Sequence, residues 1–305
     1  MYPVFIILTI YCALIVTASL VGGWLPGMVR LTHTRMQLVM SAVGGLMLGI
    51  GVLHLLPHAA SESGSMDAAV ISMLIGMVTM FFMMRVFHFH QHAPIEEEFP
   101  EAVEDEHQNC DHEPHHHHHH GHAHELDPSP MRWLGIFLGL ALHTLIDGIA
   151  LAASVVAATH DKPVYGLVGI GVFLGVVLHK PLDALSITFV MRASKWSPKA
   201  INLVNIGYAS MCPIGVILFM NSLSNFGDTQ HYVVGCALGF SAGVFICLAL
   251  GDILPEVQFH SHDRWKLSIL LLVGVGVAYA IGYLEPPHLH SHQAPVVNEV
   301  LEVEK

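Results

Sequence analysis

Residues 131–159 read MRWLGIFLGLALHTLIDGIALAASVVAAT, an apolar stretch whose middle holds the five residues HTLID at 143–147. The stretch exceeds the roughly 20 apolar residues that a helix needs to cross the hydrocarbon core of a bilayer. The next stretch, 165–191, is also apolar and holds HKPLD at 179–183. We therefore interpret both stretches as membrane-spanning helices, and each carries the pattern His-x-x-x-Asp.

The composition of the whole chain also indicates a membrane protein. Of its 305 residues, 53% are hydrophobic and 12% are charged, and the mean hydropathy is +0.57. Soluble domains contain about twice this share of charged residues, ~25%. Apolar segments of membrane-spanning length occur at 2–22, 37–58, 67–87, 131–159, 165–191, 198–222, 232–256 and 267–284. The sequence thus predicts an all-α, polytopic membrane protein with eight transmembrane helices in a single domain over residues 1–305.

Basic residues predict the orientation of these helices. If the eight helices alternate in direction, one side of the membrane receives Arg30, Arg35, Arg85, Arg132, Arg192, Lys195, Lys199, Arg264 and Lys266. Only Lys162 and Lys305 fall on the other side. Short loops rich in Lys and Arg face the cytoplasm. We therefore predict that both termini, including the tail 285–305, are extracytoplasmic, and we expect the protein in the cell membrane.

The first apolar segment has one alternative interpretation, a cleaved signal peptide. A signal peptide begins with a positively charged region and has a short apolar core. Here no Lys or Arg precedes the segment, and the apolar run over 2–22 is longer than such a core. A membrane helix is therefore favoured.

Most of the negative charge lies in one polar stretch that is also rich in histidine. The formal net charge is −12, and the acidic cluster at 96–113 contains no Lys or Arg, so nothing suggests a nucleic-acid partner. We predict that 88–128 is a disordered cytosolic loop. Because imidazole binds zinc and similar metals, the loop is expected to capture metal ions, the alternative being a solvated spacer. The histidines concerned are His88, His90, His92, His115, His116, His117, His118, His119, His120, His122 and His124.

The two His-x-x-x-Asp pairs predict a metal site inside the membrane. Residues four apart lie on the same face of a helix, so His143 is paired with Asp147, and His179 with Asp183. An ionisable group in the bilayer core costs about 2.5–3.5 kcal/mol and usually has a function. Two imidazole nitrogens and two carboxylate oxygens suit tetrahedral Zn²⁺ and would also accept Fe²⁺, Mn²⁺ or Cd²⁺. We predict that these four residues hold the ion.

A related pattern occurs near a proline in the second and seventh segments. When the two prolines are superposed, His54 matches Asp252 and His58 matches Glu256. Such similarity is typical of the inverted repeats of transporters, whose binding sites lie between the repeats. In the predicted orientation, the two histidines lie near the outer mouth and the two acids near the cytosolic exit of an ion pathway. The alternative is that the histidines merely cap the second helix.

At these residues the chain resembles the ZIP (Zrt-, Irt-like) family of metal-ion transporters. The family pattern His-Asn-x-x-(Asp/Glu)-Gly is matched by HTLIDG at 143–148, and His-Glu-x-Pro-His-Glu is loosely matched by HKPLDA at 179–184. The His-rich loop after the third helix fits as well. The resemblance implies an eight-helix bundle arranged three, two, three that moves Zn²⁺ or similar ions towards the cytosol. The sequence leaves a homodimer open.

The chain departs from the family at three positions. Many relatives hold two metal ions with the help of residues whose places are taken here by Thr144, Lys180 and, in the sixth helix, Cys212. A lysine ammonium repels a second cation and can pair with a neighbouring carboxylate. We therefore predict one transport site, with Lys180 in the place of the second ion.

Two other functions use similar residues within a membrane. Cation diffusion facilitators also use His-x-x-x-Asp pairs and export metal, but they resemble six-helix bundles followed by a soluble domain, whereas only a short tail follows residue 284 here. A membrane-embedded zinc hydrolase needs an open metal position and a general base. The four predicted ligands leave no open position, so we expect that the protein is not an enzyme.

Overall fold

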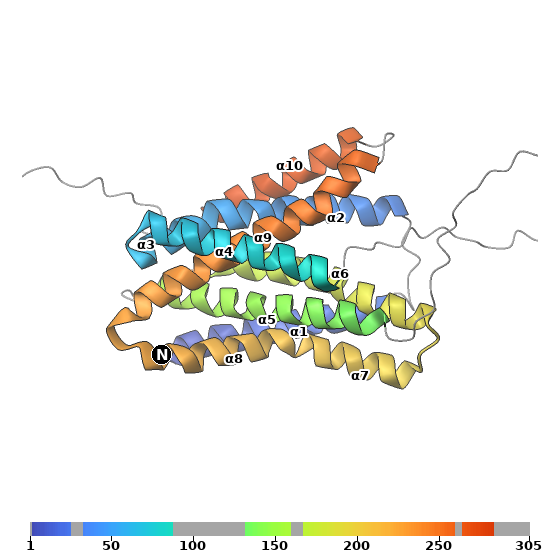
Figure 1. The fold of residues 1–305 in the computed structure, drawn as a ribbon, viewed down its shortest axis with the longest axis horizontal. Helices are drawn as coiled ribbons and strands as arrows, with labels where there is room; N and C mark the ends of the chain where they lie inside the picture. Colours follow the sequence, from blue (N-terminus) through green and yellow to red (C-terminus); the bar gives the residue numbers. More distant parts are fainter. Residues whose placement is uncertain (1, 26–32, 88–131, 160–166, 260–263, 284–305) are drawn as a thin grey trace, which may run out of the picture.

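The described part of the chain is built from helices. The computed structural model describes residues 2–25, 33–87, 132–159, 167–259 and 264–283. Every regular element in these ranges is helical (Figure 1). In chain order they are α1 (Tyr2–Trp24), α2 (His33–Ile50), the π-helix η2 (Gly51–Leu55), α3 (Leu56–Ser63), α4 (Met66–Phe87), α5 (Arg132–Thr159), α6 (Ile170–Ala193), α7 (Pro198–Ala209), α8 (Met211–Leu223), the 3₁₀-helix η3 (Ser224–Thr229), α9 (Gln230–Phe259) and α10 (Arg264–Ile281).

Most of these helices are long and apolar enough to cross a membrane. Among the described residues, six continuous helical stretches meet this condition, and a shorter apolar helix covers Trp265–Ile281. One of the six, Pro198–Gly251, turns back at η3, where Gly227 leaves the helical conformation with φ 48° and ψ −125°. These stretches confirm a polytopic, all-α membrane protein. The count of eight spans remains a prediction.

The outside of the bundle is apolar, as a lipid-facing surface requires. Large hydrophobic side chains are widely exposed on the outer helices, among them Ile71, Val86, Leu203, Ile206 and Leu272. In water such a surface would promote association. In a bilayer it faces hydrocarbon, while the backbone polar groups are satisfied within each helix.

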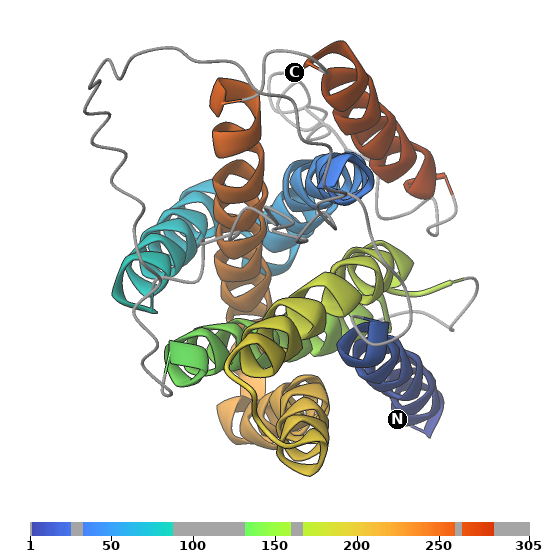
Figure 2. The same cartoon turned by 90° about the vertical axis from the view of Figure 1, so that its right-hand side faces the viewer.

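Helices α5 and α6 lie in the middle of the bundle. Helix α5 packs against α6, α8 and α9, and α6 packs against α1, α2 and α7. Seen from the end of the bundle, α1, α5, α6, α7 and α8 form one side, and α2, α4, α9 and α10 form the other (Figure 2). The pair that carries both His-x-x-x-Asp motifs therefore has partners from both halves of the chain.

The second helical segment runs further than the sequence pattern predicted. The prediction ended at residue 58, but the helix continues through the π-turn of η2 and through α3 to Ser63. It ends at Gly64, whose φ of 65° lies in the left-handed region that glycine tolerates best. His54 lies in the π-turn and His58 in the middle of α3, so the alternative that they cap this helix is wrong.

Glycines allow several helices to approach closely. A side chain at Gly274 of α10 would collide with the backbone of α2 at Ala42, and a side chain at Gly243 of α9 would collide with α4 at Met73. Small residues at such contacts let membrane helices pack backbone to backbone. The close packing of α2 on α10 and of α4 on α9 therefore depends on glycine.

Leucine substitutions on α10 test this packing. We expect Gly274→Leu to lower the stability of the purified protein by about 1–3 kcal/mol, because overpacking forces α10 away from α2. The matched control is Gly276→Leu on the same helix, since a side chain at Gly276 would meet nothing within 4 Å. Thermal unfolding in detergent gives the measurement. Equal melting temperatures for the two variants would contradict the close contact.

Candidate metal centre

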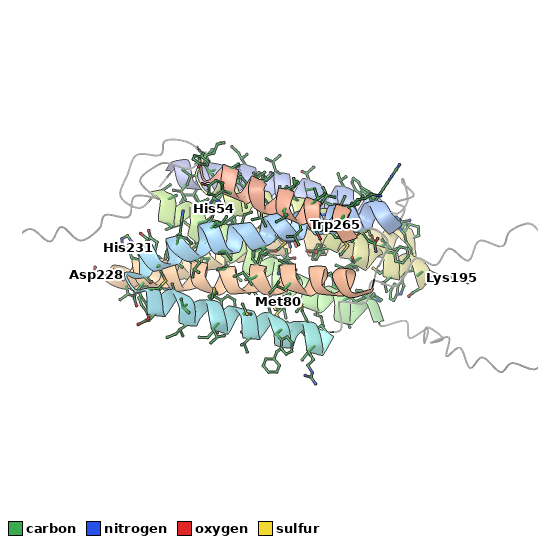
Figure 3. The ribbon with its side chains drawn as sticks, turned by 90° about the horizontal axis from the view of Figure 1, so that it is seen from above. His54, Met80, Lys195, Asp228, His231 and Trp265 are labelled. Carbon is green, nitrogen blue, oxygen red and sulfur yellow. The ribbon has the colours of Figure 1, made fainter. Side chains whose placement is uncertain are left out.

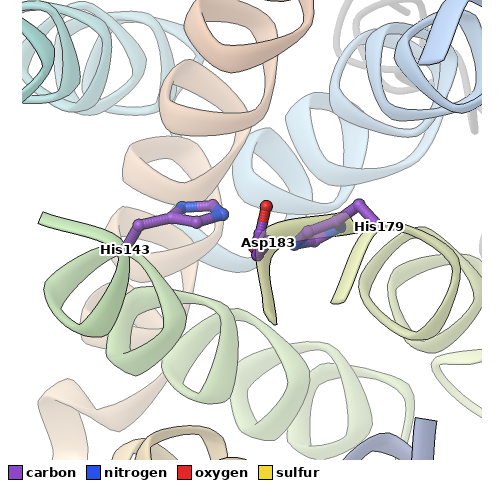
Figure 4. Close-up of side chains that lie close together, drawn as sticks. All are labelled: His143, His179 and Asp183. Atoms are coloured by element: carbon purple, nitrogen blue, oxygen red, sulfur yellow. Dashed lines mark ion pairs between the residues drawn. The ribbon is translucent and has the colours of Figure 1, made fainter. Parts of the chain in front are cut away.

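The four predicted ligands come together in the middle of the bundle. His143 and Asp147 lie on α5, and His179 and Asp183 lie on α6. The side chains of the first three are almost wholly buried, and that of Asp183 is 15% exposed. Figure 4 shows the two imidazoles pointing towards each other from the two helices, with the Asp183 carboxylate between them. The i, i+4 spacing places the imidazole and the carboxylate of each motif on one face of its helix.

The distances between the donor atoms suit one small ion. Asp147 Oδ2 lies 3.3 Å from Nε2 of both His143 and His179, and Asp183 Oδ2 lies 3.7 Å from His179 Nε2. The ligand atoms of His143, His179 and Asp183 all lie within 4.8 Å of one another. A tetrahedral zinc ion with bonds of about 2.0–2.2 Å holds its ligand atoms roughly 3.3–3.6 Å apart. Only small side-chain movements would therefore enclose an ion.

Hydrogen bonding around the imidazoles favours metal ligation. His179 Nδ1 donates to the carbonyl oxygen of Gly175 at 2.7 Å, which turns Nε2 towards the carboxylates. Backbone carbonyls commonly orient ligand histidines in this way. Both ring nitrogens of His143, and Asp147 Oδ1, are buried without a hydrogen-bond partner. Buried polar atoms are rarely left in this state, and a bound cation would satisfy the carboxylate oxygen and one imidazole nitrogen.

Lys180 lies among the carboxylates. Its Nζ is 2.5 Å from Asp147 Oδ2, 3.2 Å from Asp183 Oδ2 and 3.0 Å from Thr144 Oγ1, and its side chain is buried. A buried ammonium group needs such partners, because removing an unpaired charge from water is costly. The structure thus brings together two of the three residues at which the sequence departs from the family pattern, Thr144 and Lys180.

The third such residue, Cys212, lies at the beginning of α8. It is fully buried, and its backbone carbonyl packs against Gly148, next to Asp147. Among the described residues, the cluster of metal-ligating side chains at this place consists of His143, His179 and Asp183. It contains neither Cys212 nor Asp147, whose Oδ2 lies close to both imidazoles but is paired with Lys180. Helix α8 therefore comes close to the centre at Cys212 because Gly148 of α5 has no side chain.

Tyr208 of α7 also belongs to this centre, although the sequence did not predict it. Its hydroxyl lies 2.9 Å from Asp183 Oδ2, to which it donates, and 2.9 Å from Thr144 Oγ1, and the residue is fully buried. Its ring also lies under the Lys180 ammonium, with 5.8 Å from Nζ to the ring centroid. No spacing rule connects α7 with α5 or α6. The one available signal was a tyrosine in an apolar helix, whose hydroxyl needs a partner when buried.

The predicted pathway residues are described only in part. His54 and His58 line a small pocket together with Leu55, Ser154, Ala158, Gly169, Val172 and Leu238, and His54 Nε2 donates to the carbonyl oxygen of Ala278 at 2.7 Å. Asp252 and Glu256 belong to α9, but their side chains lie outside the described residues. The same is true of all predicted histidines between 88 and 124.

Apolar helices around a buried group of imidazoles and carboxylates define a membrane protein that can bind a divalent metal ion. A comparison with family models identifies which one: the model of the ZIP zinc transporters matches residues 5–282, and the chain belongs to this family. No curated protein matches the chain. ZIP proteins are transporters and not enzymes. The protein is accordingly an integral, multi-pass transporter of divalent metal ions, and the exporter and hydrolase alternatives are set aside.

Removal of the Tyr208 hydroxyl tests its part in this centre. We expect Tyr208→Phe to raise the KM for metal uptake by about tenfold, because Asp183 loses the hydrogen bond that orients it. The matched control is Tyr279→Phe, whose exposed hydroxyl contacts only that of Tyr283 among the hydrogen bonds of the described residues. Uptake by proteoliposomes over a range of zinc concentrations gives the measurement. An unchanged KM in Tyr208→Phe would contradict the orienting role.

Proposed function

We propose that the protein carries zinc ions, one at a time, towards the cytosol through the site formed by His143, Asp147, His179 and Asp183. The observation that carries the proposal is the spacing of their donor atoms, with Asp147 Oδ2 at 3.3 Å from both imidazoles. All four side chains belong to one chain. A homodimer is therefore compatible with this function but not required by it.

The types of donor atom support zinc as the preferred ion. Imidazole nitrogen and carboxylate oxygen are borderline to hard ligands that Zn²⁺ readily accepts in tetrahedral geometry. Fe²⁺, Mn²⁺ and Cd²⁺ accept the same donors, so we expect them to compete. A soft ion such as Cu⁺ would favour thiolates, and the donor cluster in the described residues contains none.

Charge supports the transport of a single ion. Two carboxylates and one ammonium give the empty centre a formal charge of −1, and one divalent ion brings it to +1. A second divalent ion would raise this charge to +3 within a region of low dielectric, where like charges repel strongly. Lys180 Nζ, at 2.5 Å from Asp147 Oδ2, also occupies the space beside the shared carboxylate.

The orientation of the protein in the membrane is inferred from the distribution of basic residues, and transport towards the cytosol is what the resemblance to the ZIP family implies. Lys195 and His231 lie at opposite ends of the bundle (Figure 3). We place the Lys195 end in the cytosol because its loops carry most of the Lys and Arg. The same proposal includes four further points. The protein lies in the cell membrane and its termini are extracytoplasmic. The ion leaves to the cytosol near Asp252 and Glu256, and the histidines of 88–128 capture metal ions.

Uptake measurements with ligand variants test the site. We expect His143→Ala and Asp183→Asn to lower zinc uptake into proteoliposomes by about 100-fold, because loss of a directly bound ligand costs at least as much as the loss of a residue that only supports one. The control is Asp67→Asn, which removes an exposed carboxylate at the beginning of α4. Normal uptake in both ligand variants would show that the ion passes elsewhere.

The number of zinc ions bound per chain tests whether the centre holds a single ion, as the position of Lys180 implies. We expect wild-type protein to hold one more zinc ion per chain than Asp147→Asn, when both are equilibrated at the same free zinc concentration. Comparing the two cancels the ions held by histidines elsewhere in the chain. The measurement is metal content by mass spectrometry after dialysis. A difference of two ions would overturn the single-ion site.

A further inference from the structure

Two side chains at the His231 end of the bundle have no part in the function proposed so far. Glu62 lies near the end of α3, and His231 lies at the beginning of α9. Glu62 Oε2 is 2.9 Å from His231 Nδ1. The His231 side chain is 44% exposed and that of Glu62 is 15% exposed, so a polar, accessible pair stands at the surface. Figure 3 shows His231 at this end, with the exposed Asp228 close by.

The pair lies next to the small pocket that contains the two pathway histidines, on the side towards the His231 end of the bundle. Glu62 follows His58 by one helical turn, or about 6 Å along α3. His231 precedes Leu238 by two turns, or about 10 Å along α9. Both His58 and Leu238 line the pocket. Helices α3 and α9 thus contribute residues both to the lining of the pocket and to the surface pair.

The pocket lies about two helical turns from the metal centre along α5 and α6. Ser154 of the pocket follows Asp147 by seven residues on α5, and Val172 of the pocket precedes His179 by seven residues on α6. Seven residues are close to two full turns, so each pair of residues shares one helix face. The surface pair, the pocket and the metal centre therefore form one column along the bundle.

Close helix packing fixes the geometry of the surface pair. Gly235, one turn after His231, lies so close to Ser63 that any side chain there would collide with the backbone of α3. Ser63 is the direct neighbour of Glu62. Because the two backbones are held together at this point, the carboxylate and the imidazole meet with little loss of side-chain freedom.

We propose that Glu62 and His231 form a capture site for a zinc-like divalent cation, which then passes to His58 and His54 in the pocket. One carboxylate oxygen and one imidazole nitrogen are ligands that such an ion accepts, and water would complete its coordination. Two protein ligands hold an ion weakly, which suits a site that must release it again. This inference rests on the proposed transport through the centre below.

The alternative is a purely structural ion pair between α3 and α9. His231→Lys separates the two, because lysine keeps the attraction to Glu62 but offers no nitrogen lone pair to a metal when protonated. A structural pair would survive this change. A capture site would lose a ligand and gain a positive charge facing the incoming ion.

The experiment measures zinc uptake by proteoliposomes against external zinc concentration. We expect Glu62→Gln, His231→Gln and His231→Lys each to raise the KM by about tenfold, with a nearly unchanged maximal rate, because each removes a ligand that holds the ion before entry. Asp67→Asn is the control, since it removes an exposed carboxylate at the same end without touching the pair. It should keep the wild-type KM.

The other outcomes overturn the proposal. A wild-type KM in Glu62→Gln and His231→Gln means that no capture takes place, and a wild-type KM in His231→Lys alone means that the pair is structural. Asp183→Asn, measured in parallel, separates this result from the proposed function. If Asp183→Asn abolishes uptake while the surface variants transport normally, the central site stands and the capture site fails. If Asp183→Asn transports normally, the central site fails.

Discussion

Lys180 forms buried ion pairs with Asp147 and Asp183, and these pairs fix how the central helices of the bundle pack. Each of these charges would cost several kcal/mol if it were buried alone. Lys180 Nζ at 2.5 Å and 3.2 Å from the two carboxylates compensates both, and Thr144 and Tyr208 add hydrogen bonds. Because these groups come from α5, α6 and α7, the network fixes how the three helices face one another inside an apolar bundle.

The same network determines what the centre can bind. Asp147 Oδ2 already accepts the Lys180 ammonium, whereas Oδ1 is buried without a hydrogen-bond partner. Each carboxylate oxygen has more than one lone pair, so Asp147 can keep Lys180 and still offer a lone pair to a metal ion between the two imidazoles. Lys180 and one divalent ion are thus compatible, while a second ion would need the place of the ammonium group. The position of Lys180 therefore supports transport of single ions by this member of the ZIP family.

Local spacing in the sequence predicted more of the centre than of its surroundings. The His-x-x-x-Asp repeats were sufficient to pair residues within α5 and within α6, and apolar length was sufficient to predict membrane helices. Contacts between distant segments follow no such rule: Tyr208 meets Asp183 from another helix, and Glu62 meets His231 across 169 residues. The π-turn around His54 and the break between α7 and α8 at Ser210 were not predicted either, although Pro57 follows the first and Pro213 follows the second within three residues.

The two sides of the bundle seen in Figure 2 are held together internally by polar contacts. In the side that contains the centre, the network joins α5, α6 and α7, and Asn205 of α7 donates to the carbonyl of Leu20 in α1. In the other side, His54 donates to α10, and Glu62 pairs with α9. Where the sides meet, Ile50 and Phe245 pack against Gly175, one turn from His179. Separating such apolar contacts exposes no unpaired buried charge, whereas separating α5 from α6 would. Access of an ion to the buried centre therefore requires least free energy where the two sides move against each other and the charge network stays intact.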